Sequence, residues 1–238
     1  MDKERKMADI RSNFSEKTRE YDDRVRKIIP RYEEMLDVLI SSVAGPRGEK
    51  KRAIDIGCGT GAVSQRLLSS LQNVELTCLD MTQDMLDIAK QRLREHHNVR
   101  FVLADIYDFA FDGPYDIIVS SLALHHVITD QDKKEVYRKI FRSLGPGGSF
   151  YNADLVLGSD EELQERYMTQ WKAFMYQNFP RKEIDNVQVP RYHQEDSPAK
   201  LVDHLAWLRE VGFSGVDVVW KYYNFAVFGG KKTSGGRP

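Results

Sequence analysis

The sequence predicts an α/β fold: a doubly wound, mostly parallel sheet with helices on both faces. Stretches of strand and helix character alternate from residue 50 to about residue 157, which is the order of a parallel sheet. The strand candidate at 115–120 carries apolar residues side by side, as expected when helices cover both faces. A glycine-rich turn at 57–61 lies where the first strand candidate passes into a helix, the usual place for a ligand in such sheets.

Length and composition narrow the class of protein. A chain of 238 residues suits one domain with insertions, and 35 Lys+Arg against 36 Asp+Glu leave no basic excess for direct nucleic-acid binding. The 2 cysteines show neither metal-ligand spacing nor disulfide density. The N-terminus lacks an apolar signal region, and no apolar run approaches the length of a membrane span. We therefore expect a cytoplasmic protein without membrane contact.

The alternating core spans residues 50–157. Its strand candidates are residues 52–56, 74–79, 99–104, 115–120 and 148–155, and its helix candidates are residues 62–71, 83–95 and 132–144. Before this core, residues 1–45 read as a helical lid. One face of its second helix carries Tyr32, Met35, Leu36, Leu39, Ile40 and Val43. Pro30 separates that helix from a preceding one, and Gly45-Pro46-Arg47-Gly48 ends it.

Residues 158–196 interrupt the alternation and read as a helical insertion. Ser159 and Glu162 resemble a capping box at the start of this insertion. The sequence after Pro180 is polar and predicts irregular structure. An apolar stripe on the predicted helix of this insertion either packs in the core or forms the wall of a substrate pocket. The stripe comprises Tyr167, Trp171, Phe174 and Met175.

The final segment, 197–229, predicts a last helix and a hairpin. Ser197-Pro198 has the composition of an N-cap followed by N1, and the helix is expected to run to about Glu210. Residues 216–220 and 222–228 then predict two strands, and residues 230–238 predict a disordered tail. We therefore expect residues 1–238 to form a single domain.

The glycine turn and two later aspartates predict a nucleotide-type site. Glycines 57, 59 and 61 put no side chain between the backbone and a ligand at a helix N-terminus. Asp80 ends the second strand candidate, where its carboxylate can accept from ribose hydroxyls. Asp105 ends the third, where it can accept from an adenine amino group. Because the turn also satisfies a relaxed dinucleotide pattern, a nicotinamide enzyme stays open at this point.

Taken together, residues 50–157 resemble the class I S-adenosylmethionine-dependent methyltransferases. The resemblance rests on the glycine turn, Asp80, Asp105, the exit loop SLALHH and the turn LGPGG, in that order. It implies a Rossmann-like, seven-stranded sheet with an antiparallel last strand, S-adenosyl-L-methionine as cofactor, and in-line methyl transfer to a small-molecule acceptor. The cofactor-binding residues that it implies are Tyr32, Gly57, Cys58, Gly59, Gly61, Asp80, Met81, Asp105, Ile106 and Ser121.

A narrower resemblance is to the group that includes carboxy-S-adenosylmethionine synthase, and it rests on residues 14–36, 196–213 and 220–230. In that group a tyrosine two residues after a proline covers the cofactor, which here is Tyr32. An arginine in the penultimate helix holds the extra carboxylate of the product, and Trp207 stands in its place here. An indole cannot pair with a carboxylate, so Trp207 favours ordinary methyl transfer. The resemblance also hints at a homodimer.

The catalytic candidates are His125 and His126, which follow the fourth strand, and Tyr21 on the lid. Asp154, at the end of the fifth strand, is a further polar group within reach. His125 reads equally as a hydrogen-bonded wall residue rather than a base. Adjacent histidines are expected to point apart on a regular backbone, so we expect no metal site. Carboxy-S-adenosylmethionine synthesis and a non-catalytic cofactor-binding partner protein remain the alternative functions.

Overall fold

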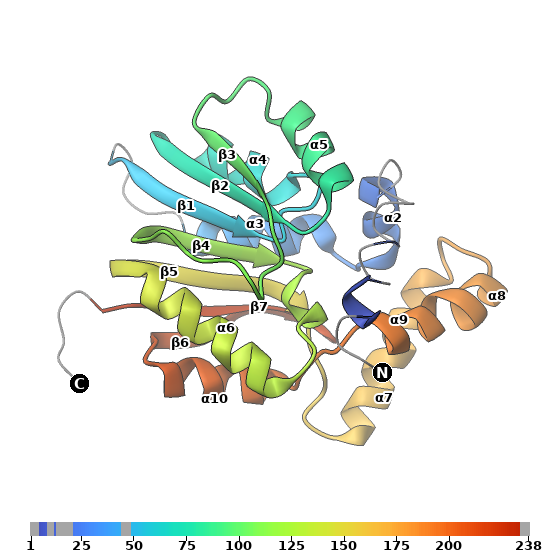
Figure 1. Cartoon of the computed structure of the whole chain (residues 1–238). Helices are drawn as coiled ribbons and strands as arrows, with labels where there is room; N and C mark the ends of the chain where they lie inside the picture. The colour runs from blue at the N-terminus through green and yellow to red at the C-terminus, as the bar shows by residue number, and fades with distance from the viewer. Residues whose placement is uncertain (1–4, 9–11, 13–20, 44–48, 234–238) are drawn as a thin grey trace.

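A seven-stranded sheet with the order β3-β2-β1-β4-β5-β7-β6 organises the chain (Figure 1). This is a computed structural model, and it describes residues 5–8, 12, 21–43 and 49–233. The strands are β1 (Lys51–Ile56), β2 (Val74–Asp80), β3 (Val99–Leu103), β4 (Tyr115–Ser121), β5 (Leu144–Leu155), β6 (Ser214–Tyr222) and β7 (Phe225–Lys231). Strands β1 to β5 pair in parallel, and β7 lies antiparallel between β5 and β6. The predicted seven-stranded, mostly parallel sheet is confirmed.

Helices cover both faces of this sheet. The helices are α2 (Tyr21–Ile28), α3 (Tyr32–Val43), α4 (Ala62–Ser70), α5 (Gln83–Arg92), η2 (Leu124–His126), α6 (Asp130–Ser143), α7 (Glu161–Met175), α8 (Arg181–Glu183), η3 (Ile184–Gln188), α9 (Val189–Glu195) and α10 (Leu201–Val211). In Figure 1, α6 lies in front of the sheet, α10 lies along its lower edge near β6 and α3 lies behind it, while α2 and α7 to α9 gather beyond one end of the strands. Within the described residues, no helix combines the length and apolar character that crossing a membrane requires.

Two apolar clusters fill the space between the sheet and its helices. Successive strand residues point to opposite faces, so Ala53 packs in one cluster with helices α3 and α4, whereas Ile54 packs in the other with α6 and α10. The same division separates Ile117 from Ile118 on β4. Adjacent apolar residues in these strands are therefore explained by burial on both faces.

Local signals misplaced two helix starts. Asp160, not Ser159, caps α7, because its Oδ1 accepts a hydrogen bond from Leu163 N at 2.8 Å. Helix α10 begins at Leu201 rather than after Ser197, although Ser197-Pro198 has the right composition. The Ser197 amide instead donates to the His125 carbonyl at 2.9 Å, which holds this stretch against the exit of β4. A tertiary contact thus overrides a good capping pair.

Other boundaries also differ from the predictions. The stretch after Pro180 is not irregular: α8, η3 and α9 follow one another, and η3 is a π-type turn. The hairpin turns at Tyr223-Asn224, and β7 runs to Lys231, so Gly230 and Lys231 belong to the strand rather than to the predicted tail. A Cβ at Gly229 would lie 2.0 Å from the Phe150 carbonyl oxygen, which explains a glycine inside this strand. The predicted stop at 45–48 and the tail at 234–238 lie outside the described residues.

A buried polar contact joins the helices on the α6 face. His204 on α10 lies 2.7 Å from the Tyr137 hydroxyl through its Nδ1. Its ring also packs against Phe228 and Trp207, with centroids 5.0 and 5.3 Å away. Burial lowers the pKa of His204 from 6.5 to about 4, because the surroundings disfavour the charged imidazolium.

This lowered pKa predicts an acid-sensitive contribution to stability. The unfolded chain binds a proton at His204 below about pH 6.5, while the folded chain does not until about pH 4. The part of the unfolding free energy that depends on uncharged His204 is therefore fully present above pH 6.5 and is lost as the pH falls toward 4. Between pH 7 and pH 5 we expect the wild type to lose about 2 kcal/mol more unfolding free energy than His204→Gln. Urea unfolding at several pH values measures this difference, and parallel pH profiles for the two proteins would refute it.

Candidate functional site

A cleft opens at the carboxyl ends of β1, β2 and β4, and we call it the strand-end cleft. It encloses about 710 Å³ of free space, part of which is continuous with solvent. The lid contributes Met7 and Tyr21, and the exit of β4 contributes Leu122 and His126. Of the residues that the family resemblance implies for the cofactor, those lining this cleft are Gly57, Gly59, Asp80, Met81, Asp105, Ile106 and Ser121. Residues far apart in the sequence thus meet at one edge of the sheet.

The glycine loop needs glycine for two different reasons. Gly57 and Gly59 have φ angles of +68° and +52°, in the left-handed region. A Cβ on Gly57 would lie 2.3 Å from the Cβ of Ala123, so the loop packs directly against the exit of β4. A Cβ on Gly59 would meet no atom within 4 Å. Since Gly59 lines the cleft, its missing side chain leaves room for a ligand.

Asp80 holds this loop in place. Its Oδ2 accepts from the Gly59 amide at 2.8 Å, and its Oδ1 accepts from the Thr82 amide at 2.9 Å. Burial raises the pKa of the Asp80 carboxyl, and these backbone amides act in the opposite direction. A carboxylate can accept about four hydrogen bonds, so acceptor positions remain for a ligand hydroxyl.

Asp105 shapes the next wall of the cleft. Its Oδ1 accepts from the Tyr107 amide at 3.1 Å, and its carbonyl accepts from the Phe109 amide at 2.9 Å. This tight turn follows β3 directly and brings Ile106 into the lining. The third strand of the sheet thereby adds a polar and an apolar group to the same cleft.

The lid is fastened to the glycine loop. Asp22 on α2 accepts from the Thr60 hydroxyl at 2.6 Å and forms an ion pair with Arg92 on α5. Arg92 also donates to the Thr60 hydroxyl at 3.0 Å. These contacts hold α2 so that the adjacent Tyr21 lines the cleft. No local pattern in the sequence connects Asp22, Thr60 and Arg92, which come from three separate elements.

Three of the residues expected at the cofactor do not line this cleft. Tyr32 begins α3, packs in the core and faces a separate groove with Arg26 and Arg66, so the lid tyrosine over the cleft is Tyr21 instead. Cys58 is buried within the loop as a free thiol. Gly61 has a φ of +83° and forms the N-cap of α4, where a Cβ would lie 3.2 Å from the Cβ of Ala89. Its role here is to turn the chain.

A second cavity lies between the lid and the helical insertion, and we call it the insertion cavity. It encloses about 880 Å³ of free space, part of it open to solvent. It shares Tyr21, Leu122 and His126 with the strand-end cleft. Of the apolar stripe on α7, Trp171 lines the cavity while Met175 is buried in the core, so the stripe is partly core packing and partly a cavity wall.

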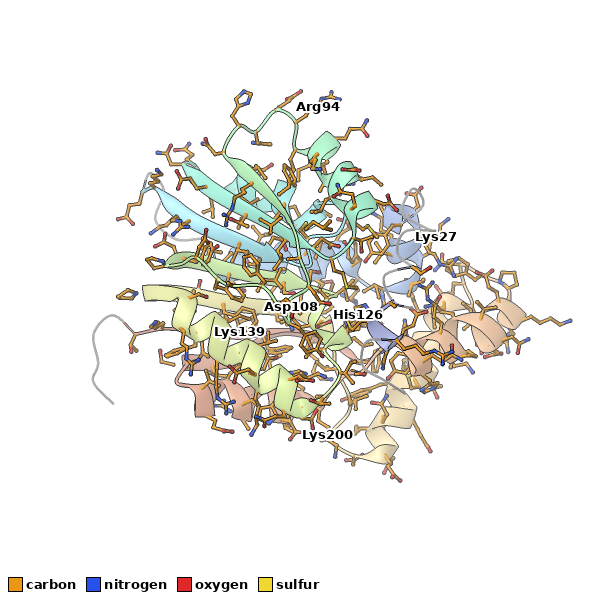
Figure 2. All side chains as sticks on the ribbon, in the orientation of Figure 1. Lys27, Arg94, Asp108, His126, Lys139 and Lys200 are labelled. Atoms are coloured by element: carbon orange, nitrogen blue, oxygen red, sulfur yellow. The ribbon has the colours of Figure 1, made fainter. Side chains whose placement is uncertain are left out.

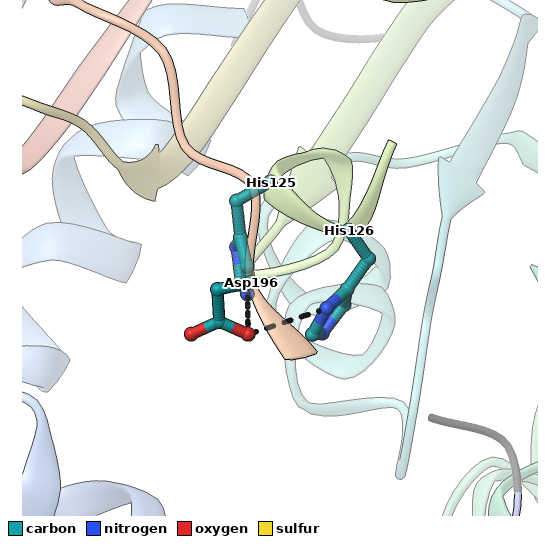
Figure 3. A group of neighbouring side chains, drawn as sticks. All are labelled: His125, His126 and Asp196. Carbon is teal, nitrogen blue, oxygen red and sulfur yellow. Dashed lines mark ion pairs between the residues drawn. The ribbon is translucent and has the colours of Figure 1, made fainter. Parts of the chain in front are cut away.

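Two histidines and Asp196 lie where the cavities meet, and the buried Asp154 lies behind His125. His125 Nδ1 is 2.5 Å from Asp154 Oδ1, and its Nε2 is 3.6 Å from Asp196 Oδ1. His126 Nδ1 is 3.4 Å from the same Asp196 oxygen (Figure 3). The expectation that the adjacent histidines point apart is wrong: η2 is a 3-10 turn, and the ring centroids are only 4.1 Å apart. Figure 2 places His126 near the middle of the molecule, whereas Arg94 lies at its rim.

The charges in this group are coupled. Burial disfavours the charged form of His125, but Asp154 and Asp196 outweigh it and raise the pKa of His125. Burial raises the pKa of Asp196 to about 6. Burial, together with the neighbouring His125, lowers the pKa of His126 well below its usual value. The sequence offered no sign of Asp196, because it lies in a stretch expected to be irregular and about 70 residues from the histidines.

Trp207 lies elsewhere. Its side chain is buried in the cluster on the α6 and α10 face, against His204. It is not among the residues that line the strand-end cleft or the insertion cavity. Trp207 therefore differs in sequence from the arginine of the synthase group, but its side chain makes no contact with the strand-end cleft or the insertion cavity.

Comparisons with known proteins place the chain among methyltransferase-like proteins. A family described as a methyltransferase domain matches residues 53–148. Carboxy-S-adenosyl-L-methionine synthase of Helicobacter pylori strain G27 is 27% identical over 229 residues, covering 90% of both chains. The synthase of Nautilia profundicola is 24% identical over 217 residues, covering 87% of this chain and 88% of that protein.

Solved structures share the fold. The S-adenosylmethionine-dependent methyltransferase SibL, in its apo form, superposes with a TM-score of 0.61 at 17% identity. The match covers 84% of this chain and 55% of SibL, so this chain spans about half of that protein. Human N-acetylserotonin methyltransferase in complex with SAM superposes with a TM-score of 0.56 at 17% identity, over 84% of this chain and 51% of that one.

A pair of glycine variants separates packing from ligand contact. Both Gly57→Ala and Gly59→Ala place alanine at a positive φ, which costs about 1–2 kcal/mol. Only Gly57→Ala adds a clash, with Ala123, so we expect it to lose a further 1–3 kcal/mol or so of stability. We expect Gly59→Ala to weaken S-adenosylhomocysteine binding at least about tenfold, since its methyl enters the cleft. Thermal unfolding and calorimetry measure both effects, and unchanged affinity in Gly59→Ala would contradict this placement.

The substitution Asp80→Asn tests whether the Asp80 carboxylate contacts the cofactor. The substitution keeps the shape but removes the charge, and hydrogen bonds to charged groups contribute about 1.5–3 kcal/mol. We therefore expect S-adenosylhomocysteine to bind about 10–100-fold more weakly. Asp84→Asn, the same change at an exposed position in the first turn of α5, is the matched control. Equal affinities of the two variants would argue against a ligand contact at Asp80.

Proposed function

We propose that this chain, which belongs to the class I S-adenosylmethionine-dependent methyltransferases, transfers the methyl group to a small molecule bound in the insertion cavity. One observation carries the proposal. The strand-end cleft and the insertion cavity share Tyr21, Leu122 and His126, so a group held in one can reach a group held in the other. Methyl transfer needs this arrangement, because the attacking atom must line up with the carbon–sulfur bond.

The strand-end cleft suits the cofactor part by part. Gly59 leaves space for the amino-acid portion beside the start of α4, and Asp80 keeps acceptor positions for the ribose hydroxyls. Asp105 and Ile106 offer a polar and an apolar contact for the adenine. The sulfonium then lies toward Ser121, at the side that opens to the insertion cavity. The cofactor supplies the reactive carbon, and the protein supplies alignment and a partly dry site.

The insertion cavity suits an acceptor with an apolar body. Ile28, Trp171 and Phe225 form part of its lining. Its arginines already have acidic partners: Arg24 Nη2 is 3.2 Å from Glu183, and Arg191 Nε is 2.8 Å from Glu195. These pairs leave little uncompensated positive charge for a strongly anionic acceptor, so the cavity favours a neutral one.

The catalytic candidates border the path between the cavities. His126 and Tyr21 line both, and His125 lines the insertion cavity with its orientation fixed by Asp154. We propose that these side chains orient the attacking atom, whose proton is released to water. In-line attack breaks the bond between the methyl carbon and sulfur and leaves S-adenosylhomocysteine.

Carboxy-S-adenosylmethionine synthesis is the second candidate. It is favoured by the synthase relatives, which are similar over 90% of this chain. The alignment puts Trp207 where that group has an arginine, but Trp207 lines neither cavity, so this difference does not decide between the two activities. The assay for it is incubation with S-adenosylmethionine and prephenate, followed by mass spectrometry of the cofactor. A carboxylated product would replace methyl transfer as the function.

The proposal is tested with the full chain and a panel of neutral small molecules bearing hydroxyl, amine or thiol groups. We expect S-adenosylhomocysteine binding by calorimetry, and methylated product with at least one acceptor. Tight cofactor binding with no product across the panel would instead support a non-catalytic partner protein. If titration with NAD releases heat and titration with S-adenosylhomocysteine does not, S-adenosylmethionine is rejected as the cofactor.

A substitution in the insertion cavity should affect the acceptor alone. Trp171→Phe removes the Nε1 hydrogen bond to the Ile28 carbonyl and part of the cavity wall. We expect the acceptor KM to rise severalfold, about 1 kcal/mol, with cofactor affinity unchanged. Trp220→Phe makes the same change on the edge strand β6 and is the control. A parallel loss of cofactor affinity in Trp171→Phe would argue against separate cavities.

A further inference from the structure

We infer that His125, His126 and Asp196 form a binding site for one divalent transition-metal ion, at the boundary between the strand-end cleft and the insertion cavity. Each residue offers one ligand atom, and these atoms all lie within 4.8 Å of one another. His126 lines both cavities, and all three residues line the insertion cavity. The site therefore lies where the proposed methyl transfer would take place.

The distances suit a common ion. The Asp196 Oδ1 atom is 3.6 Å from His125 Nε2 and 3.4 Å from His126 Nδ1. With metal–ligand bonds of about 2.0–2.2 Å, neighbouring ligand atoms lie about 3.0–3.5 Å apart, depending on the geometry. The three atoms lie within 4.8 Å of one another, so the two histidine nitrogens must approach each other by up to about 1.5 Å to hold one ion together with Asp196. In Figure 3 both histidine rings approach the same carboxylate oxygen.

The surrounding hydrogen bonds are compatible with a metal ligand at His125. His125 Nδ1 is 2.5 Å from Asp154 Oδ1, so its Nε2 is the atom left to face Asp196. Asp154 in turn accepts from Asn152 Nδ2 at 3.1 Å and from the Leu155 amide at 2.9 Å. A carboxylate that orients the far nitrogen of a histidine is the usual support of a metal ligand.

The backbone brings the third ligand to the pair. The Ser197 amide donates to the His125 carbonyl at 2.9 Å, which holds the end of the insertion against η2. Lys6 of the lid donates to the Ser197 hydroxyl at 2.8 Å. Asp196 is thus tied from two sides, although its sequence position is far from the histidines. The same tie explains why α10 starts late.

The ligand set indicates the class of ion. Two imidazoles and one carboxylate suit zinc, ferrous or cobalt ions better than magnesium or calcium, which prefer oxygen ligands. Three protein ligands leave positions open, as in catalytic rather than structural sites. The competing explanation is an ion pair between His125 and the two carboxylates, with no metal. The two explanations differ in a directly measurable property, the binding of one equivalent of metal.

The chemical role of the ion rests on the proposed methyl transfer. An acceptor hydroxyl bound at an open position would release its proton to water, because a bound cation stabilises the oxyanion. The oxygen would then form its bond to the methyl carbon as the carbon–sulfur bond breaks. The sulfonium takes up the electron pair of that bond and becomes the neutral thioether. Atoms and charge balance without any further reactant.

The test uses the full chain without an affinity tag, after dialysis against a chelator. Cobalt(II) is titrated while its visible absorption is followed, and bound zinc is counted separately by elemental analysis. We expect one equivalent to bind, with a tenfold or greater loss of affinity in Asp196→Ala and in His126→Ala. Asp154→Asn should weaken binding about 10–100-fold through the orientation of His125.

The control is the double variant His96→Ala/His97→Ala, which removes an exposed adjacent pair of histidines and should leave binding unchanged. Circular dichroism and thermal unfolding, which need no ligand, show whether each variant is folded. Absence of stoichiometric binding, or binding lost in the control and kept in Asp196→Ala, overturns the site. Metal binding is read without any acceptor, so it can succeed where methyl transfer fails. Methyl transfer that persists in the metal-free protein would overturn the role of the ion in the reaction.

Discussion

The site of this protein depends on one constraint, the common direction of the strands around β1. From β1 the sheet extends through β2 and β3 on one side and through β4 and β5 on the other, all in parallel. The connecting segments leave toward opposite faces at this point, so a crevice opens beyond the strand ends. Each residue that directly follows one of these strands is delivered to that crevice. The strand-end cleft therefore needs no loop of unusual length.

Two sets of hydrogen bonds convert this crevice into a defined cleft. Asp80 fixes the glycine loop through the amides of Gly59 and Thr82. Asp22 and Arg92 then fasten the lid helix to Thr60 of the same loop. Because both sets converge on one loop, the lid and the base of the cleft are positioned together. The insertion cavity is a consequence, since α2 and the helical insertion enclose space only when the lid is held in place.

Features set by neighbouring residues could be predicted from the sequence, whereas features set by contacts between distant segments could not. The sequence predicted that Gly57, Asp80 and Asp105 lie close together, because each follows a buried strand. Parallel strands bring such positions to the same edge of the sheet. Tyr32 was expected over the cleft on the basis of its distance from a proline, but the turn at Pro30 and Arg31 directs it into the core and another groove. Ser197-Pro198 has the composition of a helix start, yet a contact with the exit of β4 keeps it extended. Local composition fails where a tertiary contact competes with it.

By itself the sequence determined the fold class, S-adenosylmethionine as the cofactor and the edge of the sheet at which the strand-end cleft opens. Periodicity and spacing carry this information, because burial on both faces and strand direction act over a few residues at a time. Only the tertiary structure decided which lid tyrosine lines the cleft, where the insertion cavity lies, and that Asp196 meets His125 and His126. These features join segments that are far apart in the sequence. Their geometry depends on packing between elements, which no local pattern encodes.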